Sequence, residues 1–198
     1  MDYIIIDLEW NQPTIPKKRR AGLIGEIIQI GAAKVDVNMQ VLETFNEIIK
    51  PQYYHKMNGD IGKLTHITNE EIDSGKLFKD VVESFKTWCG DDFVFISWGP
   101  EDTRVLENNL IEFGLDTAWL PETYDGQLMF DDQEMQEDRQ WPLNYGLYHY
   151  NEKPDGQHNA LADVYSTALV LKHLDMGYCL QDEYFICYPY YDDDTYTS

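Results

Sequence analysis

An unbroken apolar run near the start of the chain constrains the fold most strongly. The segment YIIIDLEW begins with four consecutive apolar or aromatic residues, and three of them are β-branched. Hydrophobicity that is continuous rather than alternating is typical of a strand buried on both faces. We therefore expect residues 3–8 to form a central strand of a sheet.

Length and composition favour one α/β domain. With 198 residues the chain can bury a substantial core, and no apolar run is long enough to cross a bilayer. The first residues lack the pattern of a signal peptide. Three cysteines without disulfide or zinc spacing indicate reduced thiols. We expect a cytoplasmic protein without a membrane segment.

Further strands and helices follow from local patterns. Strand-like segments occur at residues 26–37, 40–49, 93–97 and within 122–130. Apolar residues at helical spacing predict helices within residues 76–90, 100–113, 142–150 and about 158–176. Asn38 and Met39 separate two of the strands at hairpin distance, which predicts an antiparallel meander. Residues 179–198 are acidic and aromatic without a period, so we expect a frayed tail after a domain of residues 1–178.

The formal net charge of -21 argues against a general binder of polyanions. It does not exclude nucleic acid as a substrate, because enzymes that hold two divalent cations need clustered carboxylates. One strongly basic stretch, KKRR, comprises Lys17, Lys18, Arg19 and Arg20. This stretch is either a solvated loop or a phosphate contact beside an active site, and the sequence leaves both open.

Two carboxylates stand at the end of the first strand. Asp7 and Glu9 are separated by one residue, so in a strand they point to the same face. Like charges at the end of a buried strand cost Coulomb and desolvation energy unless something positive lies near them. Alternatively, the strand simply reaches solvent at Glu9.

A third carboxylate interrupts an apolar helix. The segment ALADVYSTALVL is apolar nearly all round, which indicates a helix enclosed by the fold, yet it contains Asp163. Neither lysine nor arginine lies one turn away. A metal ion or a capping hydrogen bond must therefore satisfy Asp163. His158 precedes it by five residues, and Gly156 allows the loop to fold back, so we expect an imidazole near Asp163.

A fourth candidate lies in SWGPEDTRVL. Asp102 falls in the first turn of a helix after a buried strand, where the helix dipole favours an acid and the strand end faces a crevice of the sheet. It is either an ordinary acid at a helix start or a further member of the acidic site. Glu101 competes for the same role.

In this order, the motifs DLEW, WGPED and HNALAD resemble those of the DEDDh branch of the DnaQ-like 3'-5' exonucleases. The segment EIIQIGAAKVD resembles the second strand of that family, and LTHIT resembles a segment that usually reads LTGIT. The resemblance covers roughly residues 1–176 and is strongest to the Eri-type and sporulation-inhibitor-like group, many of whose members act on RNA. The chain departs from the pattern at Asn11, where many members carry threonine, and at His66, which replaces the usual glycine.

The resemblance implies a ribonuclease H-like α/β fold with a central mixed sheet of five strands flanked by helices. It implies two Mg²⁺ or Mn²⁺ ions, a substrate that is the 3' end of single-stranded nucleic acid, RNA rather than DNA, and nucleoside 5'-monophosphates as products. His158 would accept the proton of the attacking water. The metal ligands that it implies are Asp7, Glu9, Asp102 and Asp163.

Substrate contacts would come from Trp10, Asn11 and the KKRR residues. Trp10 shares the parity of Leu8, which favours a core position over base stacking. Two alternatives to a polymer-degrading exonuclease remain open. One is a hydrolase of dinucleotides or short oligonucleotides, which needs fewer basic contacts. The other is a non-enzymatic acidic protein that occupies a partner's basic groove.

Overall fold

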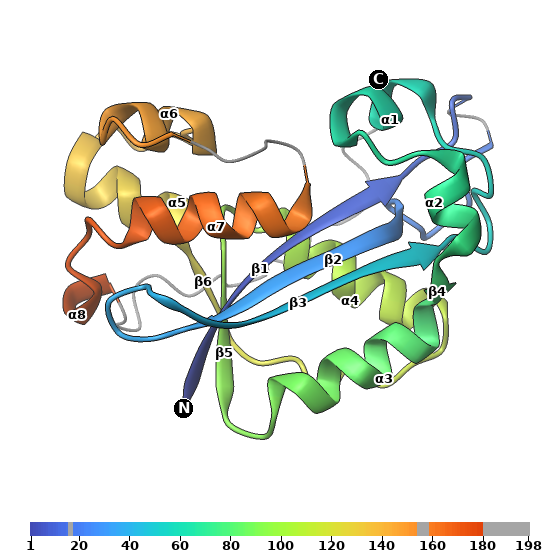
Figure 1. Cartoon of the computed structure of the whole chain (residues 1–198), viewed down its shortest axis with the longest axis horizontal. Coiled ribbons are helices and arrows are strands. Elements are labelled where there is room, and N and C mark those ends of the chain that lie inside the picture. Colours follow the sequence, from blue (N-terminus) through green and yellow to red (C-terminus); the bar gives the residue numbers. More distant parts are fainter. Residues whose placement is uncertain (16–17, 154–158, 180–198) are drawn as a thin grey trace.

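The computed structural model describes residues 1–15, 18–153 and 159–179. A mixed six-stranded sheet in the order β4-β3-β2-β1-β5-β6 forms its centre (Figure 1). The strand β1 (Asp2–Asn11) lies inside the sheet, antiparallel to β2 and parallel to β5. The predicted central strand and the ribonuclease H-like type of sheet are confirmed.

The predicted meander is present as β1, β2 (Glu26–Val35) and β3 (Val41–Lys50). The turn between β2 and β3 is held by Asp36, whose Oδ1 accepts the backbone N–H groups of Asn38 at 2.9 Å and Gln40 at 2.8 Å. The parallel part consists of β5 (Phe93–Ser97) and β6 (Thr123–Asp125). The sheet has one strand more than the five predicted.

The additional strand is β4 (Lys76–Leu77), which pairs in parallel with the end of β3. A two-residue strand is too short for a periodic pattern, so the sequence contains no local signal for it.

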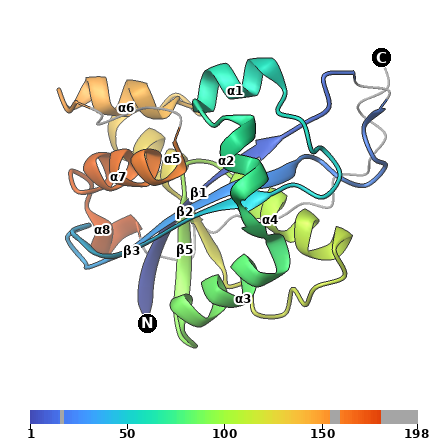
Figure 2. The ribbon, with the colours of Figure 1, turned by 45° about the vertical axis from the view of Figure 1, so that its right-hand side comes forward.

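Helices cover both faces of the sheet (Figures 1 and 2). One face packs against α3 (Phe78–Cys89) and α4 (Glu101–Glu112), and the other packs against α5 (Gly126–Phe130) and α7 (Ala160–Leu171). The helix α6 (Leu143–His149) packs on α7. Along β1, Ile4, Ile6 and Leu8 face α3 and α4, whereas Ile5 faces α7. Asp7 and Glu9 share the parity of Ile5, so they lie on the α7 face.

Two helices lie where the sequence showed only a polar segment. They are α1 (Gly59–Thr65) and α2 (Asn69–Ser74). Ile72 of α2 and Ile67 of the segment between the two helices pack against Ile28 of β2. Each is too short for a clear apolar period. A capping box formed by Thr68 and Glu71 opens α2 and was the signal available in the sequence.

The end of the described chain also differs from the prediction. The final helix was expected to reach about residue 176, but α7 ends at Leu171, and a turn leads into the short α8 (Met176–Cys179). The polar segment DDQEMQED, residues 131–138, begins with a π-helical turn, Asp131–Met135. Residues 180–198 of the expected tail lie outside the described part. Within that part, no helix combines the length and the apolar character needed to cross a membrane.

Candidate metal and active site

Three carboxylates from distant parts of the sequence meet on the α7 face of the sheet. Asp7 and Glu9 come from β1, and Asp163 comes from the first turn of α7. One carboxylate oxygen from each lies within 4.8 Å of those of the other two. All three side chains are partly buried, so β1 does not simply enter solvent at Glu9.

A glycine allows α7 to approach the sheet this closely. Gly31 of β2 is the antiparallel partner of Asp7. A Cβ atom at Gly31 would lie 2.4 Å from the carbonyl carbon of Ala160 and 2.4 Å from the backbone nitrogen of Leu161. Any side chain at position 31 would therefore push away the helix turn that carries Asp163.

The fourth acid, Asp102, is held beside β1 by the backbone. Its Oδ1 accepts the N–H of Leu8 at 2.9 Å, and the residue is only 8% exposed. Glu101 is exposed and pairs with Arg104 at 2.8 Å, so of the two competing acids Asp102 faces the site. Asp102 is outside the close group of three, but its charge acts on Asp7.

Burial and mutual repulsion dominate the electrostatics of this cluster. Burial, followed by the charges of the other three acids, holds the pKa of Asp7 well above its usual range. Burial, with Asp163 and Asp102 adding to it, raises the pKa of Glu9 to about 8. The pKa of Asp102 rises to about 7, mainly through burial, although its hydrogen bond with Leu8 opposes the shift.

These properties fit a divalent cation. Each contribution from a neighbouring charge raises the pKa of Asp7 and Glu9, so no basic side chain in the described ranges compensates them. Hard cations such as Mg²⁺ and Mn²⁺ prefer clustered carboxylate oxygens, which are the atoms that converge here.

The turn that carries Asp102 has a partner that the sequence reasoning missed. Asp125, at the end of β6, accepts the N–H of Gly99 at 3.1 Å and that of Gln127 at 2.8 Å. Burial raises the pKa of Asp125. Gly99 has a φ of +91°, which favours glycine at this position. Asp125 and Gly99 are far apart in sequence, so no local pattern signals their contact.

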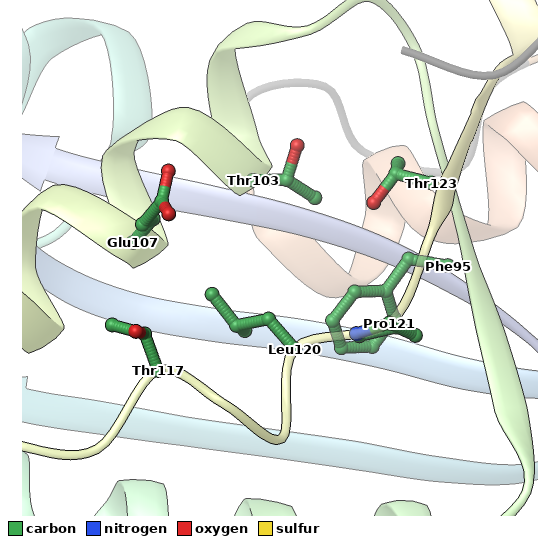
Figure 3. A pocket seen from close by; sticks show the side chains of 7 residues that line it. All are labelled: Phe95, Thr103, Glu107, Thr117, Leu120, Pro121 and Thr123. Carbon is green, nitrogen blue, oxygen red and sulfur yellow. The ribbon is translucent and has the colours of Figure 1, made fainter. Parts of the chain in front are cut away.

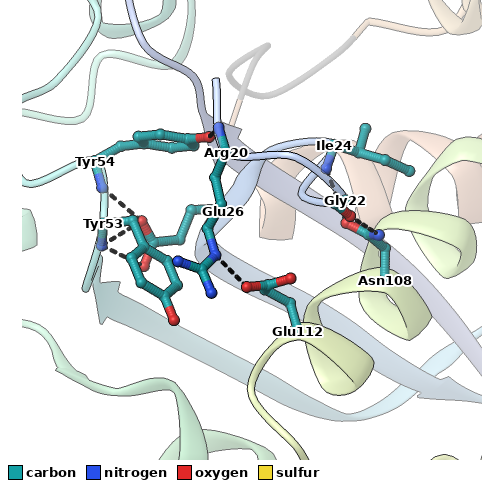
Figure 4. Close-up of polar contacts among 8 residues, drawn as sticks. All are labelled: Arg20, Gly22, Ile24, Glu26, Tyr53, Tyr54, Asn108 and Glu112. Carbon is teal, nitrogen blue, oxygen red and sulfur yellow. Dashed lines mark hydrogen bonds and ion pairs between the residues drawn. The ribbon is translucent and has the colours of Figure 1, made fainter. Parts of the chain in front are cut away.

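The basic loop is only partly free. Lys18 is exposed, and Arg19 is exposed but its Nε donates to the carbonyl oxygen of Ile24 at 3.1 Å. Arg20 pairs with Glu112 of α4, and its guanidinium lies 4.3 Å from the centre of the Tyr53 ring (Figure 4). Lys17 and His158 lie outside the described residues. The guanidinium of Arg20 therefore already has an ion-pair partner within the protein.

The segment after KKRR is fastened on two sides (Figure 4). Asn108 of α4 accepts the N–H of Ile24 at 2.9 Å and donates to the carbonyl oxygen of Gly22 at 2.6 Å. On the other side, the buried Glu26 carboxylate accepts the N–H groups of Tyr53 at 2.9 Å and Tyr54 at 2.8 Å. These bonds hold the basic loop between α4 and the segment after β3.

Trp10 and Asn11 have different surroundings. Trp10 packs against the core on the α3 and α4 face, as its parity predicts, and lies directly over Gly25. Asn11 is fully buried; its Nδ2 donates to the carbonyls of Tyr54 at 2.9 Å and Lys56 at 3.0 Å, and its Oδ1 accepts the N–H of Asn58 at 2.9 Å. The side chain of Asn11 therefore holds the segment of residues 54–58 and is not exposed at the surface.

A separate cavity of about 180 Å³ lies between α4 and the segment that leads into β6 (Figure 3). Thr103, Glu107, Leu120 and Thr123 are among its lining residues. None of the clustered acids lines it, so this cavity is distinct from the acidic site.

Comparison with known proteins identifies a family and a relative of this chain. The family model described as Exonuclease (RNase_T) matches residues 4–171. KapD of Bacillus subtilis (strain 168), a protein named "Probable 3'-5' exonuclease", is 28% identical over 107 residues, which cover 54% of this chain and 51% of KapD. The chain thus spans about half the length of this curated relative.

Solved structures share the fold at low identity. The nuclease domain of 3'hExo, a DEDDh family member bound to rAMP, is 17% identical with a TM-score of 0.78, over 90% of this chain and 93% of that one. Escherichia coli Exonuclease I in complex with dT13 is 15% identical with a TM-score of 0.67, over 87% and 40%. Because the family model spans most of its length, this chain belongs to the exonuclease family.

Proposed function

We propose that this protein is a 3'-5' exonuclease that hydrolyses the terminal phosphodiester bond of single-stranded nucleic acid, RNA rather than DNA, and releases nucleoside 5'-monophosphates. The observation that carries the proposal is the convergence of Asp7, Glu9 and Asp163 beside Asp102 in a chain of the exonuclease family. We further propose residues 1–178 as the catalytic domain, residues 179–198 as a tail, and the cytoplasm as the location. The buried, free thiol of Cys89 is consistent with a reducing compartment.

The four acids would hold two divalent cations, Mg²⁺ or Mn²⁺. When bound, such ions lower the pKa of a water and stabilise charge on the leaving oxygen. Burial disfavours the ionised form of Asp7 and Glu9, so cation binding should release protons from these carboxyl groups. Asp102 would stay oriented through its hydrogen bond to Leu8.

His158 is the proposed general base, which would accept the proton of the attacking water. It immediately precedes Asn159, which occupies the N-cap position of α7. We expect His158→Ala to lower kcat on the order of 100-fold while the affinity for Mn²⁺ changes little. A variant that cleaves at the wild-type rate would show that the base is another group.

Phosphate contacts are assigned to the exposed Lys18, to the neighbouring Lys17, and to the exposed Arg19, which would have to share its guanidinium with the carbonyl of Ile24. Arg20 and Asn11 would act by shaping the loops beside the site, and Trp10 by supporting β1 from the core. The RNA preference rests on the resemblance to the Eri-type group. Two proteins of similar structure support it: the nuclease domain of 3'hExo, which is bound to rAMP, and a 3'-exonuclease that recognises the 3' end of a histone mRNA stem-loop.

A second candidate is a hydrolase of dinucleotides or short oligonucleotides. It is favoured by the net charge of -21 and by the ion pairs that occupy many basic side chains, such as Arg20 with Glu112 and Lys172 with Glu152. A short substrate needs few phosphate contacts. The non-enzymatic acidic protein is disfavoured because it has no need of clustered, partly buried carboxylates.

A substrate panel separates these functions. The protein would be incubated with Mn²⁺ and labelled single-stranded RNA, single-stranded DNA or dinucleotides, with EDTA and the Asp163→Asn variant as controls. We expect RNA to be shortened from its 3' end only by the wild-type protein with Mn²⁺. Faster cleavage of DNA would overturn the RNA preference, cleavage of dinucleotides alone would favour the second candidate, and no cleavage would favour the interaction protein.

A further inference from the structure

A buried glutamine lies beside the acidic site without being one of its acids. Gln29 of β2 is 1% exposed and is the antiparallel partner of Glu9. A buried amide is costly unless its polar atoms have hydrogen-bond partners. Gln29 has two partners, because its Oε1 accepts the N–H of Ala160 at 3.2 Å and its Nε2 donates to Oδ1 of Asn46 at 2.9 Å.

The first of these bonds caps α7 from outside the helix. Ala160 is the first residue of α7, and the preceding Asn159 makes no side-chain capping bond. The N–H groups of a first helical turn have no partner within the helix and need one from elsewhere. Gln29 supplies it from the sheet. The same turn contains Asp163, whose N–H donates to the carbonyl of Asn159 at 3.0 Å.

The second bond engages the amide nitrogen of the same side chain. Asn46 lies on β3 and is exposed, and its oxygen takes the N–H₂ group of Gln29. The carbonyl of Gln29 is thereby left to face the N–H of Ala160. A neutral amide also avoids a further negative charge directly opposite Glu9, where like charges would repel.

We propose that Gln29 is a positioning residue of the acidic site: it holds the first turn of α7 against β2, and so sets the place of Asp163 relative to Asp7 and Glu9. Asn46 supports it by orienting the amide. The consequence for turnover rests on the proposed function, whereas the consequence for the helix turn and for cation affinity does not.

The test compares Gln29→Met with a matched control. Methionine is close to glutamine in size but cannot accept the N–H of Ala160. Gln133→Met is the control, because the Oε1 of Gln133 accepts a backbone N–H beyond the other end of α7, that of Asp175 at 2.9 Å. Amide hydrogen exchange in EDTA measures the stability of the first turn of α7. Titration with Mn²⁺, followed by electron paramagnetic resonance, measures the cation affinity of the acidic site. Steady-state kinetics give kcat and KM.

We expect Gln29→Met to speed exchange in the first turn of α7 and to weaken Mn²⁺ binding about 10- to 100-fold. Its loss of activity should lie mainly in kcat, whereas Gln133→Met should keep its Mn²⁺ affinity. Equal Mn²⁺ affinities of Gln29→Met and the wild type would overturn the proposal, as would equal losses in both variants. Wild-type protein that binds Mn²⁺ but cleaves nothing would refute the proposed function alone.

Variants of Asn46 test the supporting contact. Asn46→Asp keeps an oxygen that can accept from Nε2 of Gln29, whereas Asn46→Leu does not. We expect Asn46→Asp to retain near wild-type exchange rates in the first turn of α7, and Asn46→Leu to shift them towards those of Gln29→Met. If Asn46→Leu leaves exchange and Mn²⁺ affinity unchanged, Asn46 does not orient the amide.

Discussion

At the scale of single residues, the acidic site is unfavourable for the protein until a cation binds. Burial and repulsion raise the pKa of Asp7, Glu9 and Asp102, so each ionised carboxylate costs free energy in the metal-free state. Residues that carry function at the expense of stability are common in natural proteins. The cost should be visible as a pH dependence.

Glu9 sets the sign of that dependence. Its pKa rises from 4.5 to about 8 on folding, so between these values the folded protein binds more protons than the unfolded chain. The free energy of unfolding in EDTA should therefore fall as the pH rises through this window. Mn²⁺ compensates the ionised carboxylates, so its stabilising effect should be larger at the upper end of the window.

The measurement is Tm in EDTA and in Mn²⁺ at about pH 5.5 and about pH 8. We expect the rise in Tm caused by Mn²⁺ to be larger at the higher pH, by on the order of 5 °C. Glu9→Gln should reduce the pH dependence in EDTA. An equal rise at both pH values would contradict the assignment.

At the scale of secondary-structure elements, the decisive contact is the one between α7 and β2. Gly31 leaves no space for a Cβ atom, since the nearest atoms belong to the backbone of α7 and cannot rotate away. The sequence shows this glycine within a strand, but only the packed structure shows what lies over it.

We expect Gly31→Ala to lower the free energy of unfolding by about 1–3 kcal/mol through overpacking. It should also abolish detectable Mn²⁺ binding, because Asp163 moves with the helix. Gly59→Ala is the matched control, since a Cβ there meets nothing within 4 Å. Chemical denaturation and Mn²⁺ titration of both variants check this, and a fully active Gly31→Ala protein would contradict it.

A second element-scale prediction concerns the end of α1. His66 is the C-cap of this helix and has a left-handed conformation with a φ of 60°, which usually requires glycine. His66→Gly should therefore raise stability by about 1 kcal/mol, or about 2–4 °C in Tm. His66→Ala keeps the Cβ atom and should not stabilise. Thermal unfolding of both variants and the wild type is the measurement. Equal Tm values of His66→Gly and the wild type would show that the imidazole compensates the strain.

At the scale of the whole molecule, charge limits how the protein can hold a polymer. The net charge is -21, and basic side chains such as Arg20, Lys34 and Lys76 are engaged in ion pairs. The logarithm of the affinity for a single strand falls linearly with the logarithm of the salt concentration, with a slope of about -0.7 for each phosphate contact. Few contacts therefore mean a shallow salt dependence.

We expect a plot of log kcat/KM for a long single-stranded RNA against log[KCl] to fall with a slope of magnitude below about 2 between about 50 and 200 mM KCl. Replacing Lys18 and Arg19 together by Gln should reduce this slope by about 1 and lower kcat/KM. A control replacement of Lys63, which pairs with Asp60, should leave the slope unchanged. A steep wild-type slope would reveal a basic groove that the charge distribution does not suggest.

Much of the fold followed from the local pattern of the chain. The continuous apolar run predicted the central strand, and alternation along it predicted that Asp7 and Glu9 share a face. These features depend on neighbours in sequence, since strand and helix periodicity are properties of the backbone itself. The short elements α1, α2 and β4 were not predicted, because they have too few residues to show a periodic pattern.

The sequence by itself determined which residue types the site has available: carboxylates on a first strand, at a helix start and in an apolar helix. Only the tertiary structure decided their arrangement, namely that Asp102 rather than Glu101 turns towards β1, that Gly31 lets α7 approach, and that Gln29 caps it. The physical reason is that these contacts join segments far apart in the chain. Their energies depend on close packing and on hydrogen bonds in three dimensions, which leave no local periodicity in the sequence.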